Sequence, residues 1–157
     1  MSALAKKMKW LKKDFKQSLE SLNKSIKNLD YSYNKCLKIG IKEEYLEDEL
    51  EIFESLTSRF ARAADIFTQK ILTALFILLK ENPVSFIDKS NLAEKLGIIN
   101  SAKDLQDIRE LRNEIAHEYS MREITDIFED VLKCTGNLKE IWTEAQNYIR
   151  DKIPLDE

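Results

Sequence analysis

The first 40 residues of this 157-residue chain decide its fold class, because residues 3–40 read ALAKKMKWLKKDFKQSLESLNKSIKNLDYSYNKCLKIG. Apolar residues recur there at spacings of three and four, which places them on one face of a long helix and the lysines on the other. The stripe consists of Leu4, Met8, Leu11, Phe15, Leu19, Leu22, Ile26, Leu29, Tyr33 and Cys36. Gly40 is expected to end the helix, since the residue after the last turn often adopts a left-handed conformation.

The composition of the whole chain also favours an all-α protein. Only 3 Gly and 2 Pro stand against 34% charged and 43% apolar residues, too few turn residues for a β-sandwich or barrel. The glycines are isolated from one another, which excludes the phosphate-binding loop of a Rossmann or P-loop fold. A chain of this length buries a core as one domain. We therefore expect residues 1–157 to form a single all-α domain, an up-and-down bundle of four longer helices and one short helix.

Two further helices are predicted in the middle of the chain. One begins in the acidic run of residues 43–54, becomes apolar nearly all round toward its end, and closes at Pro83. Early carboxylates suit the positive end of a helix dipole. Ser90 is expected to cap the start of the short helix, residues 91–96, which Gly97 ends.

The last two helices follow Ser101. Ser101 and Asp104 have the spacing of a capping box, with Asp in place of the usual Glu. The final helix is amphipathic over residues 124–149, with Pro154 beyond its end. Gly136 is expected to bend or interrupt that helix, at a cost of about 1 kcal/mol relative to Ala.

Charge is distributed unevenly along the chain, although the net charge is only −3. Residues 1–40 hold 10 lysines against 3 acidic residues, whereas residues 81–157 hold 10 basic and 17 acidic residues. Six of the lysines lie within Lys6–Lys16, a segment that we call the basic arm. Such an arm can contact phosphates or an acidic partner, and the alternative interpretation is an ordinary solvated helix face.

Nothing in the sequence predicts a membrane span, an export signal or a disulfide framework. The apolar run of residues 71–79 is too short to cross a bilayer. The N-terminus is rich in lysine and lacks the apolar stretch of a signal peptide. Cys36 and Cys134 have no metal-site spacing and are expected to be reduced thiols, so we expect a cytoplasmic protein.

The segment Arg112–Tyr119, which reads RNEIAHEY, contains the residues most suited to chemistry. His117 is the only histidine of the chain, and Arg112 can bind a phosphate through two hydrogen bonds. Asn113 lies one helical turn before His117 on the same face. This combination suits phosphate chemistry without a metal or cofactor. The alternative is that a histidine near a helix C-terminus only favours the negative end of the dipole.

The spacing Arg112-x4-His117-x-Tyr119 resembles the Arg-x4-His-x-Tyr signature of HEPN-domain proteins of the HepT type. These are all-α toxins encoded beside a minimal nucleotidyltransferase antitoxin. The helical layout is similar too: a hairpin of two long helices, a short helix, and the motif before the last long helix. The resemblance extends over the whole chain, and the motif is its most specific part. The chain departs from short HepT proteins in its longer, lysine-rich start.

The resemblance implies a metal-independent endoribonuclease of a type VII-like toxin–antitoxin system. By that analogy Arg112 and His117 are catalytic and Asn113 assists them. Tyr119 is the expected site at which the partner nucleotidyltransferase attaches AMP. The expected partners are an RNA substrate, the cognate nucleotidyltransferase and a second copy of the chain.

A polar patch on the second long helix also resembles one that faces the site in related HEPN proteins. It consists of Arg59, Arg62 and Asp65, which interrupt an apolar stretch over two turns. The alternative is a simple intrahelical pair between Arg62 and Asp65, worth a few tenths of a kcal/mol.

Cleavage through a ribose 2′-hydroxyl benefits from both a base and an acid, and one chain offers only His117. A two-fold dimer would bring two copies of His117 to one cleft, with residues 71–79 and the last helix as the expected interface. Two other functions remain open: a non-catalytic subunit that binds substrate or docks a nucleotidyltransferase, and a nucleic-acid-binding bundle that uses the basic arm.

Overall fold

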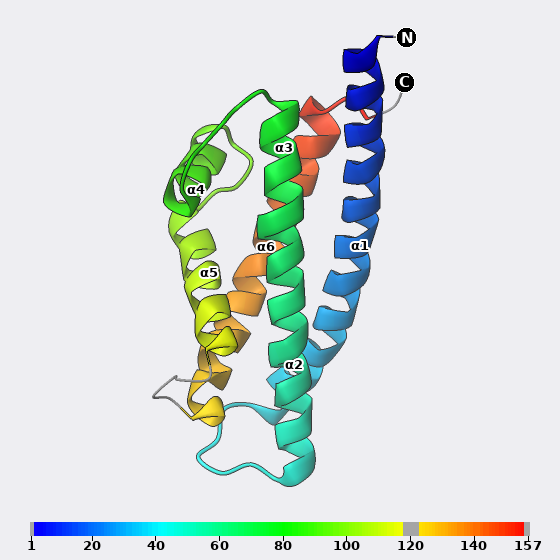
Figure 1. Cartoon of the computed structure of the whole chain (residues 1–157). Coiled ribbons are helices and arrows are strands. Elements are labelled where there is room, and N and C mark those ends of the chain that lie inside the picture. The colour runs from blue at the N-terminus through cyan, green and yellow to red at the C-terminus, as the bar shows by residue number, and fades with distance from the viewer. Residues whose placement is uncertain (1, 118–122, 156–157) are drawn as a thin grey trace.

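A computed structural model describes residues 2–117 and 123–155. All regular structure in these residues is helical (Figure 1), which confirms the expected all-α class. The elements are α1 (Ala3–Ile39), α2 (Glu47–Asp65), η1 (Ile66–Ile71), α3 (Leu72–Leu78), α4 (Phe86–Lys95), α5 (Ala102–Ala116), η2 (Ile124–Ile127) and α6 (Phe128–Lys152). The π-helical η1 joins α2 to α3 without a break, and the 3-10 helix η2 leads directly into α6.

Helix α1 confirms the long helix predicted from the apolar stripe. The Ser2 hydroxyl accepts a hydrogen bond from the Ala5 N–H at its start, and Gly40 with φ of 75° ends it. Its buried face repeats every seven residues, with large or apolar side chains at Phe15, Leu22, Leu29 and Cys36. Buried serines repeat with the same period at Ser18, Ser25 and Ser32. Small side chains at these positions allow α1 to pack closely on α2 and α6.

The second long helix runs from Glu47 to Leu78 and contains the π-helical η1, which the sequence did not indicate. It ends earlier than the predicted stop at Pro83. Lys80 adopts a left-handed conformation with φ of 58°, and its N–H and that of Glu81 close the last turn on carbonyls of α3. This closure ends the helix before proline is reached.

Helix α4 begins five residues earlier than predicted, and Ser90 is not its N-cap. Ser85 is the N-cap, because its hydroxyl accepts a hydrogen bond from the Asp88 N–H at 3.0 Å. Ser90 lies inside the helix and is buried. Its hydroxyl donates to the Ile87 carbonyl and accepts from the Gln106 amide of α5, both at 2.8 Å. The serine therefore joins two helices instead of starting one.

Helices α5 and α6 follow the prediction more closely. Ser101 caps α5 by accepting a hydrogen bond from the Asp104 N–H at 3.1 Å. Helix α6 continues through Gly136, so the expected interruption is wrong. A Cβ atom at Gly136 would lie 3.3 Å from the Tyr33 hydroxyl oxygen of α1. Glycine at this position allows that close approach of the two helices.

Aromatic side chains from distant parts of the chain form much of the core. The rings of Phe53 and Phe128 stack with their centroids 4.4 Å apart, and the Tyr45 ring contacts both edge-on. Phe67 of η1 contacts Trp142 of α6 at 6.2 Å. These contacts fix the second long helix against α6. Within the described residues, no helix is both long and apolar enough to cross a membrane.

Candidate functional site

Arg112 of α5 forms a two-pronged ion pair with Asp65, the last residue of α2. The Nε and Nη2 atoms of Arg112 donate to the two carboxylate oxygens at 2.9 and 2.8 Å. Both side chains are partly buried, with 26% and 31% of their surface exposed. The hydrogen bonds that Arg112 donates to Asp65 raise the pKa of Arg112 above its ordinary value. This geometry fixes the guanidinium, and among the described residues no second acceptor occupies Nη1 or the second N–H of Nη2.

Asp65 lies at the point where the regular α2 changes into the π-helical η1. A π-turn widens the helix and redirects the side chains around it, and such turns are frequent at functional sites. Thr68 lies inside η1 and its hydroxyl donates to the Ala64 carbonyl at 2.8 Å. The irregular turn therefore coincides with the residue that binds Arg112.

The polar patch predicted on the second long helix is divided by the structure. Asp65 binds Arg112, and the alternative pair of Arg62 with Asp65 is absent from the described residues. Arg62 is exposed. Arg59 is directed to α1, where its Nη1 donates to the Asn28 carbonyl and the Ser32 hydroxyl at 2.9 Å each. Of the three residues, the structure brings only Asp65 to Arg112.

Asn113 and His117 lie on the exposed surface at the end of α5. His117 is the C-cap residue of α5, and its backbone N–H donates to the carbonyls of Asn113 and Glu114 at 3.2 Å. The Asn113 side-chain oxygen accepts a long hydrogen bond of 3.4 Å from Nε of Arg109. Arg109 itself lies over the Phe86 ring, 4.8 Å from its centroid. The structure thus places an exposed histidine five residues beyond a fixed arginine.

Tyr119 lies outside the described residues, so its position relative to His117 is not part of this geometry.

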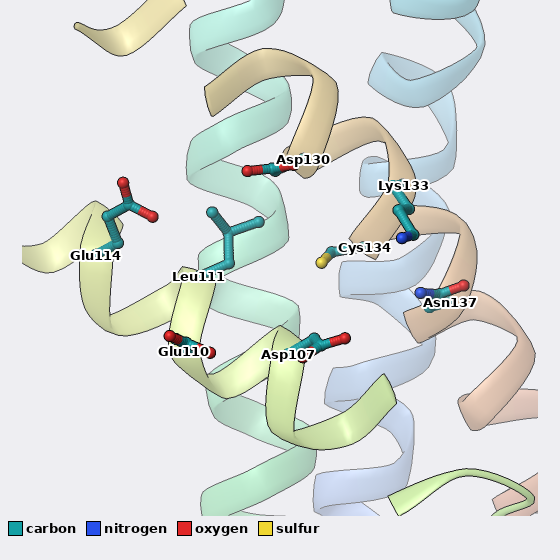
Figure 2. Close-up of a pocket in the computed structure, with 8 residues that line it drawn as sticks. All are labelled: Asp107, Glu110, Leu111, Glu114, Asp130, Lys133, Cys134 and Asn137. Atoms are coloured by element: carbon teal, nitrogen blue, oxygen red, sulfur yellow. The ribbon is translucent and has the colours of Figure 1, made fainter. Parts of the chain in front are cut away.

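A cavity of about 240 Å³ lies on the other flank of α5, facing α6 (Figure 2). It is lined by Asp107, Glu110, Leu111, Glu114, Asp130, Lys133, Cys134 and Asn137. None of Arg112, Asn113 and His117 lines it. Its carboxylates disfavour a phosphate, so this cavity does not suit the chemistry that the motif predicts.

The Cys134 thiol lies at this cavity and is almost fully buried. Burial raises the pKa of Cys134 to about 11, with a further contribution from the negative charge of Asp107. The thiol therefore stays protonated at neutral pH and is a poor nucleophile or metal ligand. Within the described residues, no group of three or more His, Cys, Asp or Glu side chains is placed to hold a metal ion.

The sequence marked Asp65 only as one member of a polar patch. Its position opposite Arg112 is determined by the fold. The two residues lie 47 positions apart in the chain. Neither the ion pair nor the π-helical turn has a signal within a short window of sequence. Only the interrupted apolar pattern around Asp65 marked it.

Comparison with known proteins does not assign the chain to a family. No protein-family model, curated protein or solved structure matches it. The resemblance to HepT-type proteins therefore depends on the motif around His117 and on the helical layout.

Proposed function

We propose that the chain is a metal-independent endoribonuclease toxin of the HepT type. The observation that carries this proposal is the fixed Arg112, held by Asp65 through two hydrogen bonds and followed five residues later by the exposed His117. Cleavage of a phosphodiester without a metal requires a fixed cation and a group that transfers protons, and Arg112 and His117 are of these two kinds. The up-and-down bundle of four longer helices and one short helix is part of the same proposal.

The proposed reaction is attack of a ribose 2′-hydroxyl on the adjacent phosphorus. His117 removes the proton from the 2′-hydroxyl as the new P–O bond forms. The bond to the 5′-oxygen breaks, and that oxygen takes up a proton, which leaves a 2′,3′-cyclic phosphate and a 5′-hydroxyl. Arg112 stabilises the charge on the phosphorane through the donors that Asp65 leaves available, and Asn113 assists by binding a phosphate or ribose oxygen.

A second copy of the chain completes the proposed site. The leaving oxygen needs an acid while the 2′-hydroxyl needs a base, and a two-fold dimer supplies two copies of His117 for the two roles. The interface expected from residues 71–79 and the last helix is mostly buried core: among the described residues, Ile77 at 47% is the exposed large apolar side chain of residues 71–79, and α6 exposes none. Ile87 of α4 is exposed at 61% and can add to the contact. A dimer stable enough to act in this way buries more than about 1,000 Å² in total.

Control by a nucleotidyltransferase partner is proposed at Tyr119. An attached AMP adds bulk and a negative phosphate two residues from His117. That charge competes with the substrate phosphate for Arg112 and closes the site. Mass spectrometry after co-expression with a partner nucleotidyltransferase is expected to find AMP on Tyr119. Modification that maps only to Tyr31, Tyr33, Tyr45 or Tyr148 would count against this control.

The test of the proposed activity is cleavage of single-stranded RNA in the presence of EDTA. We expect products that end in a 2′,3′-cyclic phosphate, and we expect His117→Ala to abolish them. His117 is exposed, so this variant should keep the helical content and melting temperature of the wild type. Activity that disappears on chelation and returns with Mg²⁺ would contradict the mechanism.

One observation favours a second candidate function, a non-catalytic subunit that docks a nucleotidyltransferase. The Arg112–Asp65 ion pair joins α5 to α2, and a purely structural role in holding the two helices together also accounts for it. In that case Arg112→Ala and Asp65→Ala would lower stability, the wild type would leave RNA intact, and binding to the nucleotidyltransferase would be retained.

A further inference from the structure

The first turns of α1 lie outside the core of the molecule. Residues 2–14 include no fully buried side chain, and the buried face of the helix begins at Phe15. Figure 1 shows this end of α1 extending beyond the end of α3. The Leu4 side chain is 71% exposed and Trp10 is 62% exposed. Trp10 is therefore accessible to another molecule.

This segment contains most of the basic arm. Among the described residues, Lys6, Lys7 and Lys13 make no ion pair, and Asp14 is the only acidic side chain in residues 3–16. The rest of the molecule is acidic, with 17 acidic against 10 basic residues in residues 81–157. Lys6, Lys7 and Lys13 therefore keep their positive potential and attract a polyanion to this end of the molecule.

Trp10 is placed among the lysines and not on the apolar stripe. Lys6, Lys7 and Lys13 lie three or four residues from Trp10 and are its neighbours on the helix surface. At about 100° per residue, Leu4 lies about 120° and Met8 about 160° around the helix from Trp10. The apolar stripe with lysines on the opposite face would also suit a helix that lies in a membrane surface. Trp10 lies outside that stripe, with the three lysines and one acidic residue, Asp14, as its neighbours. An aromatic ring placed among lysines suits a polymer in which bases alternate with phosphates.

We propose that this part of the basic arm is a docking surface for single-stranded RNA. Trp10 stacks on a base, and Lys6, Lys7 and Lys13 contact the flanking phosphates. The choice of RNA rests on the proposed function. Asn28 of α1 contacts Arg59 of α2, and Trp10 is about 27 Å from Asn28 along α1 at about 1.5 Å per residue. Asp65 follows Arg59 by six residues, or about 9 Å, on a helix antiparallel to α1 (Figure 1), so Trp10 is about 18 Å along the helix axes from the Asp65–Arg112 pair. The arm therefore binds a part of the RNA distant from the scissile bond and acts only on strands long enough to reach both places.

The experiment uses the His117→Ala protein, so that binding is measured without cleavage. Affinity for a fluorescent single-stranded RNA of about 20 nucleotides is measured by anisotropy at several salt concentrations. We expect Trp10→Ala to weaken binding between about 5- and 100-fold, as loss of a stacked base does. We expect joint replacement of Lys6, Lys7 and Lys13 by Gln to weaken binding at least about 10-fold and to reduce the salt slope by about 2.

The matched control replaces Lys24, Lys27 and Lys38, three exposed lysines further along the same helix, by Gln. It removes the same charge and is expected to change the affinity less than the arm variants do. Equal losses in the two triple variants, or an unchanged affinity after Trp10→Ala, would overturn the docking surface. Binding of vesicles of anionic phospholipid that competes with RNA for Trp10 would also overturn it.

A cleavage assay separates this inference from the proposed function. With His117 restored, the arm variants should raise KM for the long RNA and leave cleavage of a dinucleotide unchanged. RNA that binds through Trp10 but is never cleaved supports the docking surface and contradicts the ribonuclease. Dinucleotide cleavage lost together with long-RNA cleavage in the Trp10→Ala variant would contradict a remote docking role.

Discussion

The two flanks of α5 use their charges in opposite ways. On one flank Arg112 is paired with Asp65 and fixed in place. On the other, Asp107 and Glu110 line a cavity of about 240 Å³ beside Cys134 (Figure 2). The carboxylates on the cavity side repel a phosphate, and Arg112, the phosphate-binding group of our proposal, does not line that cavity. The proposal therefore depends on the position of a fixed cation and not on the volume of a cavity.

The largest expected effect is on the Arg112 flank. Arg112→Ala should lower the rate of RNA cleavage by about 100- to 1,000-fold, as removal of a donor that stabilises transition-state charge does. Arg109→Ala is the matched control, because Arg109 lies on the same helix, over the Phe86 ring, and has no carboxylate partner among the described residues. The control should stay within a few-fold of the wild type. Equal losses in both variants would indicate a general electrostatic effect and not a specific role for Arg112.

The second expected effect compares ion pairs on the two flanks. Asp65→Ala leaves Arg112 partly buried without its acceptor, and we expect the free energy of unfolding to fall by about 1 kcal/mol. Lys103 and Asp107 form an exposed pair on the other flank, with the lysine side chain 81% exposed. Double-mutant cycles in urea should give that pair no more than about 0.5 kcal/mol. A coupling energy for Asp65–Arg112 no larger than that of Lys103–Asp107 would contradict this ranking.

The fold was predictable wherever a local pattern repeats over several turns. The apolar stripe that begins at Leu4 and the stop at Gly40 predicted both ends of α1 to within a residue. The prediction succeeded because the spacing of three and four residues persists over the length of the helix. Helix ends were harder where two signals compete. Ser85 precedes Phe86 and Ser90 precedes Asn91 and Leu92, and the reciprocal bonding with Asp88 distinguishes Ser85 as the true cap.

The candidate site was predictable only in part, because its central contact is not local. The motif identified Arg112, and the interrupted apolar pattern identified Asp65, but their pairing depends on how α5 packs on α2. The intrahelical partner for Asp65 that the sequence offered, Arg62, remains exposed instead. The π-helical turn at Ile66–Ile71 likewise has no pattern of its own in the sequence. Contacts of this range are set by tertiary packing and not by helix propensity.

The third expected effect concerns alkaline pH. Burial raises the pKa of both Cys36 and Cys134 to about 11. In the unfolded chain these thiols lose their protons first, so the folded state binds more protons and stability falls as pH rises from about 9 toward 11. Melting temperatures measured across this range should fall by less in Cys134→Ala than in the wild type. An identical decline in both proteins would show that Cys134 does not contribute.

The smallest expected effect tests how far the acidic flank reaches Cys134. At Cys36 the pKa is raised by burial alone. At Cys134 the negative charge of Asp107 raises the pKa in addition to burial. Asp107→Asn removes this charge and keeps the shape of the side chain, so the pKa of Cys134 should fall slightly. Alkylation of Cys134 by iodoacetamide at pH 9, followed by mass spectrometry, should then become about two- to three-fold faster because the thiolate is the reacting form. Cys36 in the same molecules is the internal control, and its rate should not change. Equal acceleration at both cysteines would mean that Asp107→Asn loosens the fold. The Asp107 flank of α5 would then contribute to the stability of the protein and not only to its charge.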